Sequence, residues 1–326
     1  TWTMRIVSGG VPTTTQHSDV FARMPALAAA VIESEATPTT HTLVAMVRSG
    51  LEEDFSRAVR MVKTYHAAHG ATPELLLAQS WLGRAALADG KLDAAETHAR
   101  ETYELGLAEL KRRSMDEEAV FPTAFGAAIE VLGRVAAERG KRSEAIAFLS
   151  GELRAHGHTS LNKRIQKNIN LLTMEGTLAP PLNLSDHEGV TPPTLESLQG
   201  RVVLLFFWAH WCSDCKAQGP VLEALSKRYG AQGFTLVAPT QRFGYVAGGA
   251  EASADVEARY IEQVRRTSYP WMAQVPVTLN ETNHQRYGVS STPTLVLVDR
   301  AGIVRLYHPG LMPEAELEPL VRRLLE

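Results

Sequence analysis

Residues 202–216 read VVLLFFWAHWCSDCK and contain the only two cysteines of the chain, Cys212 and Cys215. The apolar, β-branched and aromatic run that opens this stretch is typical of a buried strand. The residues after the second cysteine have apolar side chains at helical spacing, at Val221, Leu222, Leu225 and Tyr229. The sequence therefore predicts a strand that delivers Cys212 to the N-terminus of an amphipathic helix.

That position has a chemical consequence for Cys212. The free N–H groups and the positive end of the dipole at a helix N-terminus stabilise a thiolate over a thiol, so the pKa of the Cys212 thiol should fall. A thiolate is the attacking species in disulfide exchange. Cys215 lies three residues further on and should share the same helical face, close enough to form an intramolecular disulfide. We expect Cys212 to be the nucleophile and Cys215 the resolving cysteine.

Four other interpretations of the cysteine pair stay open. A structural disulfide across so short a loop would constrain the unfolded chain little. A zinc site would need a second pair of ligands, and the sequence has no other cysteine. A peroxidatic cysteine would need no partner three residues away. A redox-sensitive latch without turnover would use the same two thiols.

Two motifs together resemble the thioredoxin superfamily. The segment Phe207–Lys216 resembles its active site, and Ser291–Thr294 before the strand Leu295–Asp299 resembles its cis-proline loop. Within the superfamily the chain is most similar to the TlpA/ResA type of thiol-disulfide oxidoreductase, over residues 178–326. This likeness is carried by the long insertion between the two motifs and by two lead-in segments, Ala179–Leu184 and Leu198–Val203.

The resemblance implies an α/β thioredoxin-like fold with a central mixed sheet flanked by helices. It implies reduction of protein or peptide disulfides, an upstream thiol electron donor and no cofactor. Thr292 and Pro293 would dock the substrate backbone next to a cis peptide bond, and Trp211 would shield the thiol. A disulfide isomerase or oxidase and a redox-sensitive protein-binding scaffold stay open as alternatives. The resemblance also implies a bacterial cell envelope or periplasmic location, with the cytoplasm as the alternative.

The site departs from its relatives at two positions. Thioredoxin has a buried Asp where this chain has Phe206, and TlpA/ResA-type proteins often have a Glu where this chain has Gln218. Cys215 therefore has no evident internal base. Two neighbours could modulate the site: Asp214 should raise the thiol pKa values and favour a strong reductant, whereas a protonated His210 should act oppositely.

The first half of the chain is predicted to be helical and repeat-like. We expect an N-terminal extension over 1–24, an α-helical domain over 25–176 and the thioredoxin-like domain over 177–326. A pattern resembling the tetratricopeptide repeat occurs twice, and in each copy a glycine in left-handed conformation should end the first helix. Such a domain could bind a protein partner, or only pack on the rest of the chain. The copies are Leu82-Gly83-Arg84 with Gly90-Lys91 and Ala94-Ala95, then Leu132-Gly133-Arg134 with Gly140-Lys141 and Glu144-Ala145.

The remaining elements follow from local patterns. In the first half we expect helices over 24–32, 42–47, 55–66 and 160–172. In the second half we expect strands over 234–238, 275–279 and 303–307, the first of them parallel to the strand before Cys212. We also expect helices over 254–266, 284–287 and 314–325, the last with Pro319 near its first turn. Residues 242–249 read as a flexible loop that acts as a hinge or a substrate-facing lid, or else as a plain crossover.

Composition excludes several other classes of protein. The 326 residues carry a formal net charge of −3 without a dense basic run, so nucleic-acid binding has no electrostatic support. We find no signal peptide pattern and no apolar run approaching the roughly 18 residues of a membrane-spanning helix. The histidines in helix-end positions (His66, His69, His156 and His158) are expected to be solvated, so no metal site is predicted.

Overall fold

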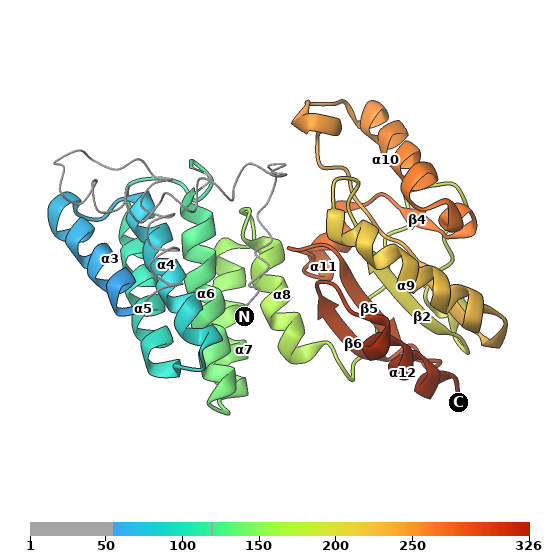
Figure 1. Ribbon diagram of the computed structural model, residues 1–326, viewed down its shortest axis with the longest axis horizontal. Coiled ribbons are helices and arrows are strands. Elements are labelled where there is room, and N and C mark those ends of the chain that lie inside the picture. Colours follow the sequence, from blue (N-terminus) through green and yellow to red (C-terminus); the bar gives the residue numbers. More distant parts are fainter. Residues whose placement is uncertain (1–54, 119) are drawn as a thin grey trace. The chain divides into compact units, whose positions relative to one another are not determined.

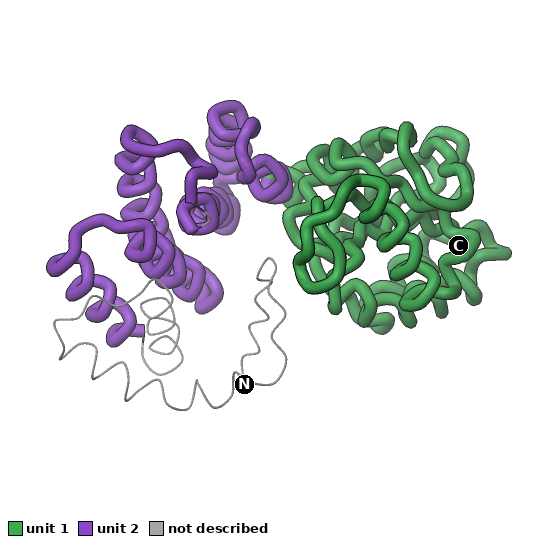
Figure 2. Tube along the Cα trace, turned by 90° about the horizontal axis from the view of Figure 1, so that it is seen from above, with its two compact units in different colours: residues 1–12, 169–326 green, residues 13–168 purple. Residues whose placement is uncertain are grey.

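The computed structural model describes residues 55–118 and 120–326, and these divide into two compact units, 55–168 and 169–326 (Figure 2). The expected N-terminal extension and the expected helices over 24–32 and 42–47 lie outside the described residues. The division between the units falls within helix α8 (Asn162–Thr173). The domain boundary at 176, which the Pro- and Gly-rich composition of residues 176–200 predicts, stays a proposal.

The helical unit, residues 55–168, consists of helices joined by short turns (Figure 1). Gly90 and Gly140 follow the first helix of each repeated pattern with φ of 71° and 78°, which confirms the left-handed conformation expected there. The segment expected to be helical over 160–172 is α8. The helices before it are α3 (Phe55–His69), α4 (Pro73–Ala88), α5 (Leu92–Glu109), α6 (Val120–Glu138) and α7 (Arg142–His156).

Both copies of the pattern use their Leu-Gly pair for close helix packing. A Cβ atom on Gly83 of α4 would lie 3.3 Å from the backbone nitrogen of Ala99 in α5. A Cβ atom on Gly133 of α6 would lie 2.9 Å from Cδ2 of Leu149 in α7. The absence of a side chain at each glycine therefore lets the two helices of a pair approach. Whether the unit is a true tetratricopeptide array stays a prediction.

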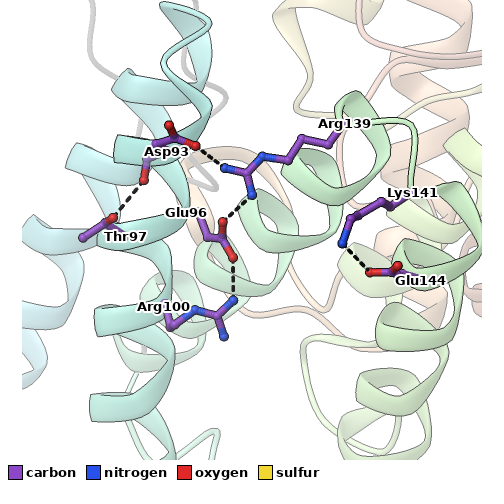
Figure 3. A network of polar contacts seen from close by, with 7 residues as sticks. All are labelled: Asp93, Glu96, Thr97, Arg100, Arg139, Lys141 and Glu144. Carbon is purple, nitrogen blue, oxygen red and sulfur yellow. Dashed lines mark hydrogen bonds and ion pairs between the residues drawn. The ribbon is translucent and has the colours of Figure 1, made fainter.

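A polar network connects the first helix pair to the second (Figure 3). Arg139, just after α6, forms ion pairs with Asp93 and Glu96 in α5. Arg100 adds a hydrogen bond of 2.6 Å to Glu96. The hydrogen bonds from Arg100 and Arg139 lower the pKa of Glu96. The start of α5 is thereby tied to the turn that follows α6.

Helix α6 is the one helix of the described residues whose length and composition would allow it to cross a membrane. Glu130 and Arg134 interrupt its apolar side chains, so it is no unbroken apolar run. The apolar side chains of α6 form the core of the helical unit instead: Phe121, Phe125, Ile129 and Val131 are buried, and α6 packs on α4, α5 and α7. Aromatic and branched residues on one helix explain both properties.

The other unit, residues 169–326, is built on a four-stranded mixed sheet of order β3-β2-β5-β6 (Figure 1). The strands are β2 (Val202–Phe207), β3 (Phe234–Val237), β5 (Thr294–Val298) and β6 (Val304–Pro309). β3 runs parallel to β2, as its helical connection predicted, whereas β5 is antiparallel to β2 and β6 is antiparallel to β5. A separate two-stranded sheet pairs β1 (His187–Glu188) with β4 (Val277–Thr278).

All six residues of β2 are buried because apolar layers cover both faces of the sheet. Alternate side chains of a strand point to opposite faces. One set, Val202, Leu204 and Phe206, joins a core with α9 (Ser213–Tyr229), α10 (Ala254–Ser268) and α12 (Glu314–Leu325). The other set, Val203, Leu205 and Phe207, packs with residues that include Val296, Tyr287 and Tyr307. This two-sided burial fixes the strand that leads to the cysteines.

Two local expectations need correction. Pro319 lies in the second turn of α12, not the first. Residues 242–249 are not a free loop: the N–H of Val246 bonds the carbonyl of Ala250 at 2.9 Å, and Tyr245 forms a β-bridge with Glu251. Backbone hydrogen bonds thus hold this segment. The short helix expected near His284 is α11 (Glu281–Arg286).

Candidate active site

Cys212 occupies the N-cap position of α9, as the sequence predicted. Its backbone is extended, with φ −78° and ψ 112°, and the N–H of Cys215 donates to its Sγ over 3.0 Å. A disulfide joins Cys212 to Cys215, whose Cα atoms are 5.2 Å apart. Sγ of Cys212 therefore accepts a hydrogen bond from one of the N–H groups that have no partner within the helix.

The register of the sheet brings the proline loop to this sulfur. β5 pairs with β2 so that Thr294 lies opposite Phe207, the last residue of β2. Thr292 and Pro293 are therefore delivered to the end of the strand that precedes the cysteines. The Thr292–Pro293 peptide bond is cis, which confirms that expectation. The carbonyl oxygen of Thr292 lies 3.4 Å from Sγ of Cys212 and can accept from the thiol in the dithiol state.

Both cysteines are buried, although they lie where the strand β2 turns into the helix α9. Cys212 is 3% exposed and Cys215 is fully buried, because both belong to the core that β2 and α9 form. The neighbouring Trp211 is 37% exposed, and its ring meets the edge of Phe243 at 5.6 Å between centroids. Trp211 is thus the large apolar side chain that the site presents to solvent.

The two positions that lack the carboxylates of related proteins have structural neighbours. Phe206 is fully buried and meets the ring of Tyr269 at 6.4 Å. Gln218, also buried, accepts from the N–H of Met312 at 2.9 Å and donates to its carbonyl at 3.0 Å. Both ends of the Gln218 amide are therefore occupied by the backbone that precedes α12. Asp214 is half-buried in the first turn of α9.

His210 is buried, not solvated, and it has a partner that sequence reasoning missed. Its Nε2 lies 3.2 Å from Oε1 of Glu257, a residue of α10. Burial lowers the pKa of His210, although the carboxylate of Glu257 acts in the opposite direction. The lowered pKa weakens the expectation that His210 acts through a positive charge. Whether His210, Asp214 and Gln218 modulate the cysteines stays a prediction.

Comparison with known proteins extends the geometric evidence. The family model for a thioredoxin-like domain matches residues 196–325. The thiol-disulfide oxidoreductase ResA of Oceanobacillus iheyensis is 35% identical over 155 residues, which are 47% of this chain and 73% of that protein. The thioredoxin-like protein YneN of Bacillus subtilis is 28% identical over 145 residues, or 44% of this chain and 76% of that protein. A second ResA, from Geobacillus thermodenitrificans, is 28% identical over 145 residues, covering 44% and 74%.

The range matched by the family model begins shortly before β2 and ends one residue before the end of the chain. It therefore contains the mixed sheet, the N-terminal cysteine of α9 and the cis-proline loop. Sequence likeness and site geometry therefore agree, and the chain belongs to the ResA-type thiol-disulfide oxidoreductases of the thioredoxin superfamily.

Proposed function

We propose that this protein reduces disulfide bonds in proteins or peptides through its two cysteines. The observation that carries the proposal is the 3.0 Å hydrogen bond from the N–H of Cys215 to Sγ of Cys212 at the start of α9. A sulfur held in this way is stabilised as the thiolate, the form that attacks disulfides. Membership of the ResA-type family supports the same activity.

The reaction has two exchange steps. The Cys212 thiolate attacks one sulfur of the substrate disulfide, so that a mixed disulfide forms and the other substrate sulfur leaves as a thiolate that takes up a proton. Cys215 loses its proton and attacks Sγ of Cys212, which releases the second substrate thiol. Two electrons pass to the substrate, and the protein is left with the Cys212–Cys215 disulfide. An upstream dithiol must then reduce this disulfide to begin the next cycle.

Backbone pairing would position the substrate. Thr292 lies directly before the cis proline, and its carbonyl is next to the attacking sulfur. An extended peptide that pairs with this backbone would place its own disulfide beside Cys212. Trp211, the residue before Cys212, offers an exposed apolar side chain for a further contact.

The direction of the reaction follows from local charge. Asp214 stands between the cysteines, and its negative charge disfavours a thiolate beside it, which makes the dithiol a stronger reductant. We expect a reduction potential of about −220 mV or lower in equilibrium with glutathione. A potential near about −120 mV, the value of a strong oxidant, would reject the reducing role. The resemblance to TlpA/ResA-type proteins favours action in the bacterial cell envelope.

Trapping tests the mechanism directly. In Cys215→Ser the mixed disulfide cannot be resolved, so a covalent complex should accumulate during incubation with a disulfide-bridged peptide. Dithiothreitol should cleave this complex by reducing its disulfide. Cys212→Ser is the matched control and should form no complex. The proposal fails if Cys215→Ser traps nothing, or if the two variants trap the peptide equally.

A further inference from the structure

We propose that Glu257 is a positioning residue: it fixes a wall beside the redox site, formed by Phe243 and Tyr245, and thereby makes the protein prefer peptide disulfides to small ones. Glu257 belongs to α10, in the insertion between the cysteine motif and the proline loop. The inference rests on the proposed disulfide reduction. It adds a substrate preference and a residue that sets it.

Glu257 is unusual because its carboxylate is buried. The residue is 1% exposed, and burying a charged group is costly unless hydrogen bonds replace its water. Three donors do so: Nε2 of His210 at 3.2 Å, the N–H of Phe243 at 2.5 Å and the N–H of Gly244 at 2.8 Å. Oε1 receives the first two and Oε2 the third. This carboxylate therefore holds two segments that are far apart in the sequence.

One of these segments leads directly into the redox site. His210 lies two residues before Cys212, on the turn between β2 and α9. A carboxylate only accepts hydrogen bonds, so the imidazole carries a proton on Nε2, facing Glu257. The ring is thus held by a carboxylate of the insertion.

The other segment places aromatic rings around that imidazole. The rings of Phe243 and Tyr245 in this segment meet His210 edge-on, each with centroids 5.5 Å away, and Tyr260 of α10 adds a third ring at 5.3 Å. Phe243 then continues to Trp211, at 5.6 Å. A chain of contacts therefore runs from the carboxylate of Glu257 through the Phe243 backbone and ring to the exposed tryptophan beside Cys212.

This wall distinguishes between substrates. A small disulfide needs only access to Sγ of Cys212, whereas a peptide that pairs with Thr292 also extends past Trp211 and Phe243. When Glu257 no longer holds Phe243, the peptide loses a preformed contact, and binding to a mobile segment carries an ordering cost. Attack on the small disulfide loses nothing of this kind.

Glu257→Gln keeps the size of the side chain but replaces one carboxylate oxygen with an –NH2 group, which cannot accept a hydrogen bond. One of the two N–H groups, of Phe243 or of Gly244, therefore loses its acceptor oxygen. The pre-reduced variant is mixed with a disulfide-bridged peptide and, separately, with bis(2-hydroxyethyl) disulfide, and both second-order rate constants are measured. We expect the peptide rate to fall about tenfold, the equivalent of one contact of about 1.4 kcal/mol. The rate with the small disulfide should stay within about twofold, because it does not use the contact.

Asp255→Asn is the matched control, since Asp255 is an exposed acid of the same helix. It should leave both rates unchanged. Phe243→Ala removes the ring without touching the carboxylate, and it should reproduce the loss of selectivity even if Glu257→Gln does not fold. The inference would be overturned if the rate constants for both substrates fell equally. It would also be overturned if Phe243→Ala left the rate constant for the peptide unchanged. Failure of the unmodified protein to reduce either substrate would instead reject the proposed function.

Discussion

The backbone N–H of Cys215 points at Sγ of Cys212 from 3.0 Å, within the first turn of α9. This contact predicts a thiol pKa for Cys212 below the roughly 8.5 of a free cysteine. In Cys215→Ser the backbone N–H remains, so the rate of alkylation by iodoacetamide should reach half its maximum below about pH 8.5. The same variant in guanidinium chloride is the control and should return to the ordinary value. A midpoint unchanged by unfolding would contradict the electrostatic argument.

Gln218→Glu should destabilise the protein rather than supply a catalytic base. The Gln218 amide donates to the carbonyl of Met312, and a carboxylate cannot. We expect a loss of about 1–3 kcal/mol at pH 8, from the unsatisfied carbonyl and the repulsion beside it. A protonated Glu can donate again, so its pKa in the folded protein should lie above the unfolded value of about 4.3.

The sign of that pH dependence is testable by thermal unfolding. Because the folded pKa would be raised, the stabilisation is present at low pH and is lost as the pH rises through the folded value. The melting temperature of Gln218→Glu should thus approach that of the unmodified protein near pH 4 and fall behind it at pH 8. A variant that is equally stable at both values, with faster turnover at pH 8, would show that the position can hold a base.

Gly83→Ala should destabilise the helical unit although alanine favours helices. Its Cβ would lie 3.3 Å from the backbone nitrogen of Ala99, which belongs to another helix and cannot rotate away. We expect a cost of about 1–3 kcal/mol by overpacking. Gly151→Ala is the control, because its nearest neighbour is the end of the Arg154 side chain at 3.8 Å. That change should stabilise by about 0.5–1 kcal/mol. Equal effects in chemical denaturation would contradict close packing at Gly83.

The lowered pKa of Glu130 should make the stability of the helical unit sensitive to acid. Burial raises the pKa of this carboxyl, but the charges and hydrogen bonds of Lys167 and Arg164 outweigh burial and lower the pKa to about 2. A depressed folded pKa gives stability that is present above the unfolded value of 4.5 and is lost as the pH falls toward 2. The contribution amounts to about 3 kcal/mol at most.

Hydrogen exchange of α6 at pH 6 and pH 3 measures this effect. In Glu130→Gln the protection of α6 should drop at pH 6 and change less between the two values than in the unmodified protein. Glu138→Gln is the control, because Glu138 pairs with Arg134 on the same helix and is exposed. If both variants behave alike, the attraction at Glu130 is no stronger than that of a surface ion pair.

Local signals were sufficient to predict the cysteine side of the site. The apolar run before Cys212 could only be a buried strand, and the helical spacing after Cys215 placed the thiol at a helix N-terminus. The strand and the helix start are each encoded within about ten consecutive residues, which is the range over which sequence patterns are informative. The cis bond before Pro293 was expected from the resemblance of Ser291–Thr294 to the cis-proline loop of the thioredoxin superfamily.

The partnership of His210 with Glu257 could not be predicted in the same way. The two residues are 47 positions apart, and no local pattern links them. One signal was available: Glu257 lies on the same face of α10 as Ile261 and Val264, so it is an acid within an apolar stripe. The Arg242–Gly249 segment was misread for a related reason. Its glycines suggested freedom, whereas the carboxylate that holds its backbone comes from the next helix.

The unequal enclosure of the two sulfurs determines how electrons enter and leave. An incoming thiolate must approach a disulfide along the axis of the sulfur–sulfur bond, from behind the atom that it attacks. Cys215 has no accessible surface, so an external thiolate can attack only Cys212. The donor that reduces the protein must therefore form its mixed disulfide with Sγ of Cys212, the same atom that reacts with the substrate, or client. Donor and client therefore react at the same atom, the donor in the disulfide state and the client in the dithiol state, so the two half-reactions can only alternate.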